Sequence, residues 1–393
     1  MKWTDAPAAR RVARCTLAAA FTACGSHGGT GPGMTGSGVA LVATVPVPAN
    51  YGQHDEFVRA GLAFLCSWNT GLQIYDVGDG RAGGSPQKPQ FISRVVTAGG
   101  EVHNAWWFWA PDGQKRYVFV GQEGPGAIGS SSSGDIHVVD VSNLSAPVEV
   151  ASYHMAGAGT HNFWVDETNQ ILYAAYYNGG VVALDISGTL SGDLSSRVIS
   201  QLAPGGPGDT YVWGVMLSNG SLYASDMLSG FWQLGLVRDT LRVLSGGNNV
   251  PERYGSDLWV ANGYGYTGTW GTRGAVLGNA VKIWKLDSTG APVLHDSIVT
   301  AGFTTVSDVR MSADGRMLVF SAEYGPNAGI YFYSLVPDPG HPTFIAYYPM
   351  VTNNQNGIHT VTISDIGGGR YVFAAEDPPT PAMLVLDVTA ISP

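Results

Sequence analysis

The chain has 393 residues and a formal net charge of −10 from 30 acidic and 20 basic residues; 13% of its residues are charged and 54 are glycines. Charged residues usually make up about a quarter of a soluble domain, so this composition indicates strands buried on both faces and joined by tight turns. No window shows sustained helical periodicity, which argues against a helical fold. No basic cluster follows the first 24 residues, so we expect no nucleic-acid partner.

The first 24 residues have the pattern of an export signal with a lipid attachment site. Four basic residues come first (Lys2, Arg10, Arg11 and Arg14), and an apolar run over 17–23 leads to Cys24. Residues 21–24, FTAC, resemble a bacterial lipobox, in which cleavage leaves the cysteine carrying the lipid. We therefore expect an exported envelope lipoprotein, at the outer membrane or on the periplasmic side. Ordinary cleavage near Ala23 is the alternative.

A flexible tether and one large domain are expected after the signal. Residues 25–40 are rich in glycine, serine and threonine, which is typical of a flexible linker. Cys66 is then the one cysteine within the body of the protein, so no disulfide can form there. It lies in a predicted strand, and we expect a small core residue rather than a reactive thiol.

A strand–turn–strand pattern recurs along residues 41–391. It is clearest in Gly134–Tyr153, where an alternating strand ends at Asp140, an Asp-Val-Ser-Asn turn follows, and a second strand runs from Val148. Further copies begin at Gly71, Gly179, Asn279 and Ala382, with weaker copies at Gly230 and Gly329. Aspartates end the strand in five copies and are interpreted as turn formers: Asp76, Asp140, Asp185, Asp287 and Asp387. The spacing of roughly 45 to 60 residues is in the range of propellers and other repeat arrays.

Two more strand signals precede each copy, so each unit has four strands. Seven units fit: 54–99, 103–154, 161–203, 213–246, 256–300, 307–350 and 359–391. Four antiparallel strands repeated seven times predict an all-β, seven-bladed β-propeller over residues 41–393. The last unit has no fourth strand. Residues Leu41–Val45 are therefore expected to pair beside Leu384–Val388 and close the ring.

The repeat resembles a known family. The segments 136–147 and 182–187 are similar to the LVIVD repeat of bacterial surface propellers. The His-Asp and His-Asn pairs that open the innermost strands resemble those of the choice-of-anchor B proteins in that group. The resemblance implies a surface propeller, and because the repeat is structural it does not imply an activity.

Histidines recur at one position of the repeat, the start of the innermost strand. In chain order that position holds His54, His103, His161, Trp213, Ser256, Ser307 and His359. The seventh blade neighbours the first, so the four histidines come from four consecutive blades and should form one arc at the end of the axial channel. The next position holds Asp55, Asn104, Asn162, Gly214, Asp257, Asp308 and Thr360.

Carboxylates and aromatic residues are predicted on the same rim. The loops between the second and third strands carry Glu123, Asp226, Glu323 and Glu376, together with Trp68, Tyr177, Trp270 and Tyr324. Apolar walls with a few placed polar groups are typical of a binding pocket. Trp213, the carboxylates and the Asp and Asn residues beside the histidines are thus candidate binding residues.

Three interpretations of the histidine arc remain open. Neutral imidazoles suit iron, copper or zinc, so His54, His103, His161 and His359 could hold one transition-metal ion, oriented by neighbours such as Asp55, Asn104 and Asn162. Four copies of an ancestral hydrogen-bonding strut between blades would give the same sequence pattern. Direct contact with a substrate, without metal, is the third interpretation.

Two classes of function follow. The favoured one is a surface binding or scaffold protein, whose upper face, at the start of the innermost strands, binds an unknown protein or small molecule. The alternative is a metal-dependent oxidoreductase or hydrolase at the axial site. The sequence contains no Gly-x-Ser-x-Gly elbow and no phosphate-binding loop in a strand–helix context.

Overall fold

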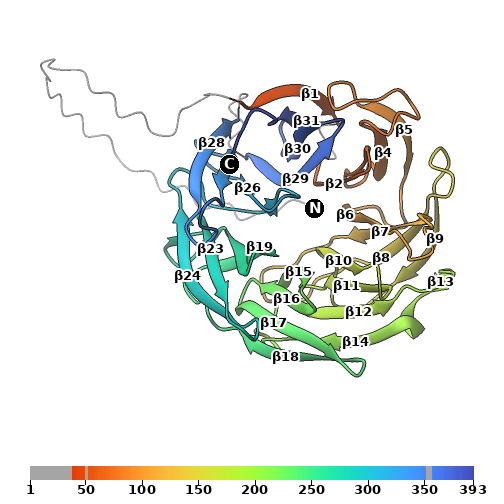
Figure 1. Cartoon of the computed structure of the whole chain (residues 1–393). Coiled ribbons are helices and arrows are strands. Elements are labelled where there is room, and N and C mark those ends of the chain that lie inside the picture. The colour runs from red at the N-terminus through yellow and green to blue at the C-terminus, as the bar shows by residue number, and fades with distance from the viewer. Residues whose placement is uncertain (1–37, 49–51, 351–355) are drawn as a thin grey trace, which may run out of the picture. The chain divides into compact units, whose positions relative to one another are not determined.

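The computed structural model describes residues 38–48, 52–350 and 356–393, and it contains a ring of seven sheets (Figure 1). The main strands of each sheet are antiparallel and pair in chain order, so the predicted all-β, seven-bladed propeller is confirmed. One 3-10 turn, Ser195–Arg197, is the helical element of the described residues. None of their helices has the length and apolarity needed to cross a bilayer. The predicted signal and Cys24 lie outside the described residues.

The first three blades follow one another along the chain. Blade 1 contains β2 (Asp55–Arg59), β3 (Leu62–Cys66), β4 (Leu72–Asp76) and β5 (Gln90–Val95). Blade 2 contains β6 (Val102–Trp107), β7 (Tyr117–Gln122), β8 (Ile136–Asp140) and β9 (Val148–Tyr153), with β13 (Gly192–Asp193) added in parallel to β9. Blade 3 contains β10 (Phe163–Asp166), β11 (Ile171–Ala175), β12 (Val181–Asp185) and β14 (Val198–Leu202).

The next three blades repeat this order. Blade 4 contains β15 (Val212–Ser218), β16 (Ser221–Asp226), β17 (Gly230–Val237) and β18 (Thr240–Gly246). Blade 5 contains β19 (Tyr254–Ala261), β20 (Tyr264–Trp270), β23 (Ala280–Leu286) and β24 (Pro292–Val299), with a small hairpin of β21 (Thr272–Arg273) and β22 (Val276–Leu277). Blade 6 contains β25 (Val309–Met311), β26 (Met317–Ala322), β27 (Gly329–Ser334) and β28 (Thr343–Pro349).

Blade 7 joins the two ends of the described domain. It contains β29 (Ile358–Ile366), β30 (Gly369–Glu376) and β31 (Ala382–Asp387), and its outer strand is β1 (Ala40–Pro46). Strand β1 is antiparallel to β31, with Thr44 opposite Leu384. The predicted closing strand is therefore confirmed. This pairing covers the edge of β31, which would otherwise be an exposed template for aggregation.

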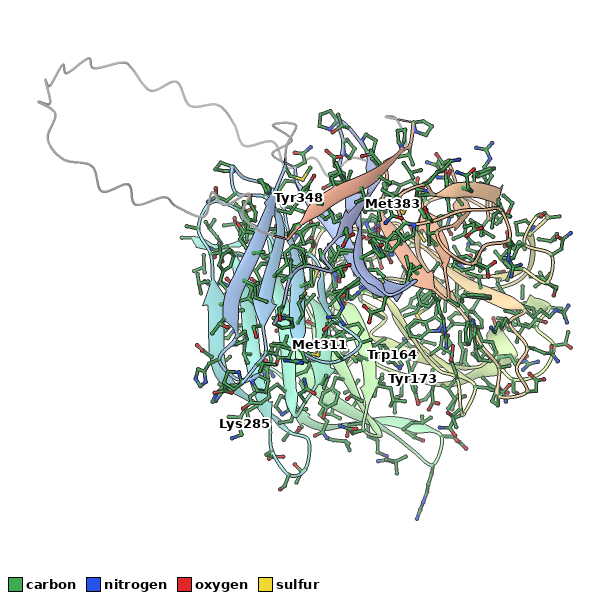
Figure 2. All side chains as sticks on the ribbon, turned by 45° about the horizontal axis from the view of Figure 1, so that its top comes forward. Trp164, Tyr173, Lys285, Met311, Tyr348 and Met383 are labelled. Atoms are coloured by element: carbon green, nitrogen blue, oxygen red, sulfur yellow. The ribbon has the colours of Figure 1, made fainter. Side chains whose placement is uncertain are left out.

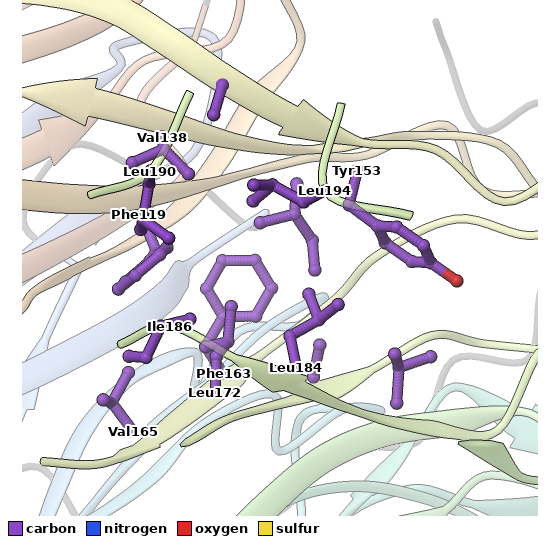
Figure 3. Close-up of a cluster of buried hydrophobic side chains, with 14 of the residues drawn as sticks. Phe119, Val138, Tyr153, Phe163, Val165, Leu172, Leu184, Ile186, Leu190 and Leu194 are labelled. Carbon is purple, nitrogen blue, oxygen red and sulfur yellow. The ribbon is translucent and has the colours of Figure 1, made fainter. Parts of the chain in front are cut away.

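The hydrophobic core is divided among the seven contacts between neighbouring blades. A separate cluster of buried side chains lies at each contact, including the one between blades 7 and 1. Between blades 2 and 3, Phe119 and Val138 pack against Leu172 and Leu184 (Figure 3). Fully burying one such side chain contributes about 1.5–3 kcal/mol. Burial at these contacts therefore stabilises the ring without a disulfide, and Cys66 is buried in one of them, as expected.

The aspartates that end the third strands are turn formers, as predicted. The carboxylates of Asp140, Asp185, Asp287 and Asp387 each accept a hydrogen bond from the backbone N–H two residues on. Asp76 accepts four such bonds, from Gly78, Gly80, Ala82 and Gly84. Burial alone would raise the pKa of Asp76, but these four N–H groups lower it to about 2. Asp76 thus holds a longer loop than its equivalents.

We expect Asp76→Ala to lower the free energy of unfolding by about 1–2 kcal/mol, because four backbone N–H groups lose their acceptor. The folded-state pKa is depressed, so this contribution is present above the unfolded pKa of about 3.8 and is lost as the pH falls towards about 2. Urea unfolding at several pH values measures it. Asp185→Ala, which removes the acceptor of one backbone N–H, is the control. An equal loss in both variants would contradict the prediction.

Candidate functional site

Bulges in the innermost strands shape the axial site. In β6 the pairing with β7 shifts between Val102 and Asn104, so His103 is an extra residue in the strand. The register shifts at the equivalent place in β15, β19 and β29. A bulge re-aims side chains and is common beside functional sites. It allows the histidine and the following Asp or Asn to lie near the axis at two successive levels.

The structure brings the four predicted histidines together. The ring centroids are 4.2 Å apart for His359 and His54, 4.1 Å for His54 and His103, and 4.3 Å for His103 and His161. Trp213 packs at a tilt against His161, with centroids 4.0 Å apart, and against Trp270, at 4.7 Å. Six aromatic rings thus follow one another around the axis. All four histidines are buried.

The two serines that share this position are already hydrogen-bonded. The Ser256 hydroxyl donates to the carbonyl of Val306, and the Ser307 hydroxyl pairs with that of Ser321. Neither hydroxyl is aimed at the histidines as a free ligand. The chemistry of this level therefore lies on the side of blades 7, 1, 2 and 3.

Glu123 is the carboxylate around which three of the histidines converge. Its Oε2 lies 3.9 Å from Nε2 of His54 and 3.7 Å from Nε2 of His103, and its Oε1 lies 4.0 Å from Nε2 of His161. The Tyr177 hydroxyl donates a hydrogen bond to Glu123 Oε1. The N–O distances are too long for hydrogen bonds. The buried Nε2 atoms of His103 and His161 have no hydrogen-bond partner among the described residues.

Backbone carbonyls set the tautomer of two of these rings. Nδ1 of His54 donates to the carbonyl of His103 at 3.1 Å, and Nδ1 of His161 donates to the carbonyl of Trp213 at 2.6 Å. A carbonyl oxygen only accepts, so Nδ1 carries the proton and Nε2 has a lone pair when the ring is neutral. Both lone pairs lie 3.9–4.0 Å from an oxygen of the Glu123 carboxylate. Such an arrangement can bind a cation.

Burial governs the charge of the cluster. Burial and neighbouring imidazoles lower the pKa values of His54, His103 and His161 well below the usual 6.5. Burial also raises the pKa of Glu123 to about 7. At neutral pH these three rings are uncharged, which is the form that coordinates metals.

His359 belongs to a different group. Its Nδ1 lies 2.9 Å from Oε1 of Glu323, and Asp377 lies close enough that the three ligand atoms fall within 4.8 Å of one another. Burial alone would lower the pKa of His359, but the Glu323 carboxylate raises it to about 10. The imidazole is therefore protonated and ion-paired at neutral pH. The predicted set of four equivalent histidines divides into three neutral rings around Glu123 and one charged ring.

Two predicted carboxylates accept hydrogen bonds from groups other than the histidines. Asp226 accepts backbone hydrogen bonds from Tyr211, Leu228 and Ser229, so it holds its own loop. Glu376 accepts a bond from Thr380 and lines a separate hollow beside β1. Both side chains make these local bonds, because a loop position on the rim does not decide which way a side chain turns.

The predicted aromatic residues do line the histidine arc. Trp68 packs edge-on to His54 with centroids 4.6 Å apart, and Tyr177 lies 5.1 Å from His161. Trp270 lies 6.0 Å from His359 and 6.4 Å from Tyr324. Trp68, Tyr177 and Tyr324 have positive φ angles of 44°, 40° and 59°. That backbone region is strained for large side chains and is often found at functional sites.

A second level, next to the histidines, contains the predicted Asp and Asn residues. Asp55, Asn104, Asn162 and Asp257 line an axial cavity, and Asp308 lies beside it. Arg310 pairs with both Asp257, at 2.5 Å, and Asp308, at 2.7 Å. Neither ion pair of Arg310 involves Glu123 or a histidine. They form a separate polar layer.

Sequence reasoning missed Glu56, Arg310 and Asp377. A signal for the first two existed: Glu56 occupies a repeat position that is apolar in the other six blades, and Arg310 one that is aromatic in four of them. Asp377 directly follows Glu376, and only the folded loop shows which of the two carboxylates turns towards His359.

Comparison with known proteins supports the fold. No protein-family model matches the chain, and no curated protein matches its sequence. Among solved structures, the chain is similar to the WD40 β-propeller domain of Doa1 at 10% identity, with a TM-score of 0.60 and 90% of this chain and 97% of that chain covered. The β-propeller domain of Myceliophteria thermophila Cps50 (Swd1) matches at 10% identity, with a TM-score of 0.59 and coverage of 90% and 100%.

A chain of the mitotic checkpoint complex is similar to the same extent. It matches at 11% identity with a TM-score of 0.59, covering 94% of this chain and 98% of that chain. At such low identity these similarities establish the propeller fold alone.

We expect Arg310→Met to lower the free energy of unfolding by about 3 kcal/mol, because Asp257 and Asp308 would stay buried without a counter-charge. Burial raises the pKa of Asp308, so the loss should be larger at pH 8 than at pH 5, where protonation of Asp308 relieves part of the penalty. Urea unfolding at the two pH values tests this.

The matched control is Arg370→Met. The two arginines are similarly exposed, at 20% and 18%, but the partners of Arg370 are Asp314 and Asp365, which are 39% and 49% exposed, against 4% and 2% for those of Arg310. Solvated pairs contribute little, so the control should lose less than about 1 kcal/mol. Similar losses in both variants would contradict the role given to Arg310.

Proposed function

We propose that this chain is an exported, lipid-anchored binding propeller that holds one divalent transition-metal ion at the axis, on the side of blades 1 to 3. The ligands would be Nε2 of His54, His103 and His161 and the carboxylate of Glu123. The observation that carries the proposal is the meeting of three buried imidazole nitrogens and one carboxylate without hydrogen bonds between them.

Three of these four groups are spaced closely enough to share an ion after side-chain adjustment. Tetrahedral ligands with bonds of about 2.0–2.1 Å lie about 3.3 Å apart, and the observed N–O distances are 3.7–4.0 Å. The ligand atoms of His54, His103 and Glu123 all lie within 4.8 Å of one another, and His161, which faces the other carboxylate oxygen, would have to move furthest to complete the shell. Zinc, copper and iron all accept imidazole and carboxylate ligands.

Burial favours a binding or structural role over catalysis. Four protein ligands fill a tetrahedral shell, whereas a catalytic zinc site keeps one position open. Tyr177 occupies one carboxylate oxygen, and Trp68 and Trp213 pack against the outer histidines. The ion would therefore stiffen the centre of the upper face, which would bind an unidentified protein or small molecule.

The family and the location are part of the same proposal. The repeats around 136–147 and 182–187 resemble those of LVIVD-type surface propellers, and Phe21–Cys24 resembles a lipobox. A lipid on Cys24 and a tether over 25–40 would place the ring beside a membrane surface in the cell envelope.

The metal site is tested by His103→Ala/His161→Ala. We expect purified wild-type protein to retain close to one equivalent of zinc, copper or iron in elemental analysis, and the double variant to retain less than a tenth of that. Wild-type protein stripped with a chelator should regain thermal stability when the metal returns, because binding to the folded state stabilises it. The double variant should not respond.

The matched control is His137→Ala, since His137 is buried but pairs with Glu149 in the outer half of blade 2. Its metal content should equal that of the wild type. If metal-free wild-type protein neither binds added zinc, copper or iron nor gains thermal stability from them, the metal proposal is wrong and the histidines act as struts between blades.

The anchor is tested separately by Cys24→Ser. We expect the wild-type protein to partition into the detergent phase with a mass shift at the mature N-terminus, and the variant to stay in the aqueous phase. Unchanged partitioning of the variant would contradict lipidation and would leave the metal proposal intact.

A further inference from the structure

The axial cavity lined by Asp55, Asn104, Asn162 and Asp257 lies beyond the histidine level. It has a volume of about 220 Å³ and is lined by the inner strands of all seven blades. None of the four histidines lines it, so it is separate from the proposed metal site. Figure 2 labels two of its lining residues, Trp164 and Met311, near the middle of the ring.

The walls of this cavity are aromatic and reach solvent. Phe57 and Trp106 have centroids 5.2 Å apart, Trp106 and Trp164 lie 5.1 Å apart, and Trp164 and Trp259 lie 6.1 Å apart. These four rings come from four blades and are all partly exposed. A ligand can therefore reach them, and their faces can bind both hydrocarbon and cations.

The deeper part of the cavity is acidic. Asp55, Glu56 and Asp257 line it and are buried, at 8%, 1% and 3% exposure. Among the described residues that line it, Arg310 is the one cationic side chain, and it pairs with Asp257 and Asp308. Asp55 and Glu56 thus form no ion pair with Arg310 in the structure.

The carboxylate of Glu56 lacks close hydrogen-bond donors among the described residues of this cavity. Its Oε1 is buried and has no hydrogen-bond partner in the described part of the chain. Its Oε2 has one distant donor, the Thr360 hydroxyl at 3.4 Å. Leaving a buried acceptor unsatisfied costs about 1–3 kcal/mol. A ligand that donates hydrogen bonds would remove that penalty.

We propose that this cavity binds an organic primary ammonium ion with an aromatic or alkyl body. The ammonium group would donate to Glu56 and Asp55, and the body would lie against Trp106, Trp164 and Trp259. A bare Mg²⁺ or Ca²⁺ ion would need six or more oxygen ligands, which the indole walls do not supply. The ligand needs a positive charge and hydrogen-bond donors to match the carboxylates at the buried end of the cavity. It needs apolar surface to match the indole rings at the open end.

Isothermal titration of the purified protein with 2-phenylethylammonium tests the proposal, with 2-phenylethanol as the neutral analogue of the same shape. We expect one amine per chain, and binding of the alcohol at least tenfold weaker. The titration is run on metal-loaded and chelator-treated protein, and the affinity for the amine should be the same in both.

Two variants locate the site. Glu56→Gln should weaken amine binding at least tenfold, whereas Glu252→Gln, which changes a carboxylate paired with Lys282 outside the cavity, should leave it unchanged. Trp164→Leu should also weaken binding. If circular dichroism shows that Glu56→Gln is unfolded, Trp164→Leu provides the test instead. Equal affinity for amine and alcohol, unchanged binding in both cavity variants, or displacement of the amine by millimolar Mg²⁺ would overturn the proposal.

Discussion

Burial of apolar side chains between neighbouring blades is the interaction on which the rest of this structure depends. Each sheet has two faces, and each face is buried against one neighbouring blade. Blade 7 buries one face against blade 6 and can bury the other only against blade 1, so the ring must close. Strand β1 completes that closure by pairing with β31. The closed ring then forces seven inner strands, from residues as distant as His54 and His359, onto one axis.

Polar groups at that axis are arranged in levels because equivalent positions of the inner strands lie at the same height, most clearly in blades 1 to 3. The histidines come first, the Asp and Asn residues next, and the aromatic residues after them. The bulges in β6, β15, β19 and β29 allow two adjacent residues to approach the axis. One channel therefore contains two chemically different environments, a neutral imidazole–carboxylate cluster and an acidic cavity with aromatic walls.

The histidines combine two roles that first looked like alternatives. Through Nδ1, His54 and His161 bond to carbonyls of the next blade and so link blades, as a strut would. Through Nε2 they converge with His103 on Glu123. The strut contact fixes the tautomer and leaves the other nitrogen as a ligand, so the structural bond prepares the chemical one. His359 pairs with Glu323 instead and belongs to a separate group with Asp377.

The sequence alone determined the fold, the closing strand, the five turn-forming aspartates and the level of the four histidines, because these follow from local alternation, turn chemistry and repeat position. It did not determine which histidines act together, that Glu123 lies among them, or that Asp377 rather than Glu376 turns towards His359. Nor did it predict the pairing of Arg310 with Asp257 and Asp308 across blades. Side-chain direction at a loop or bulge depends on contacts with residues far along the chain, and only the closed ring brings those residues together.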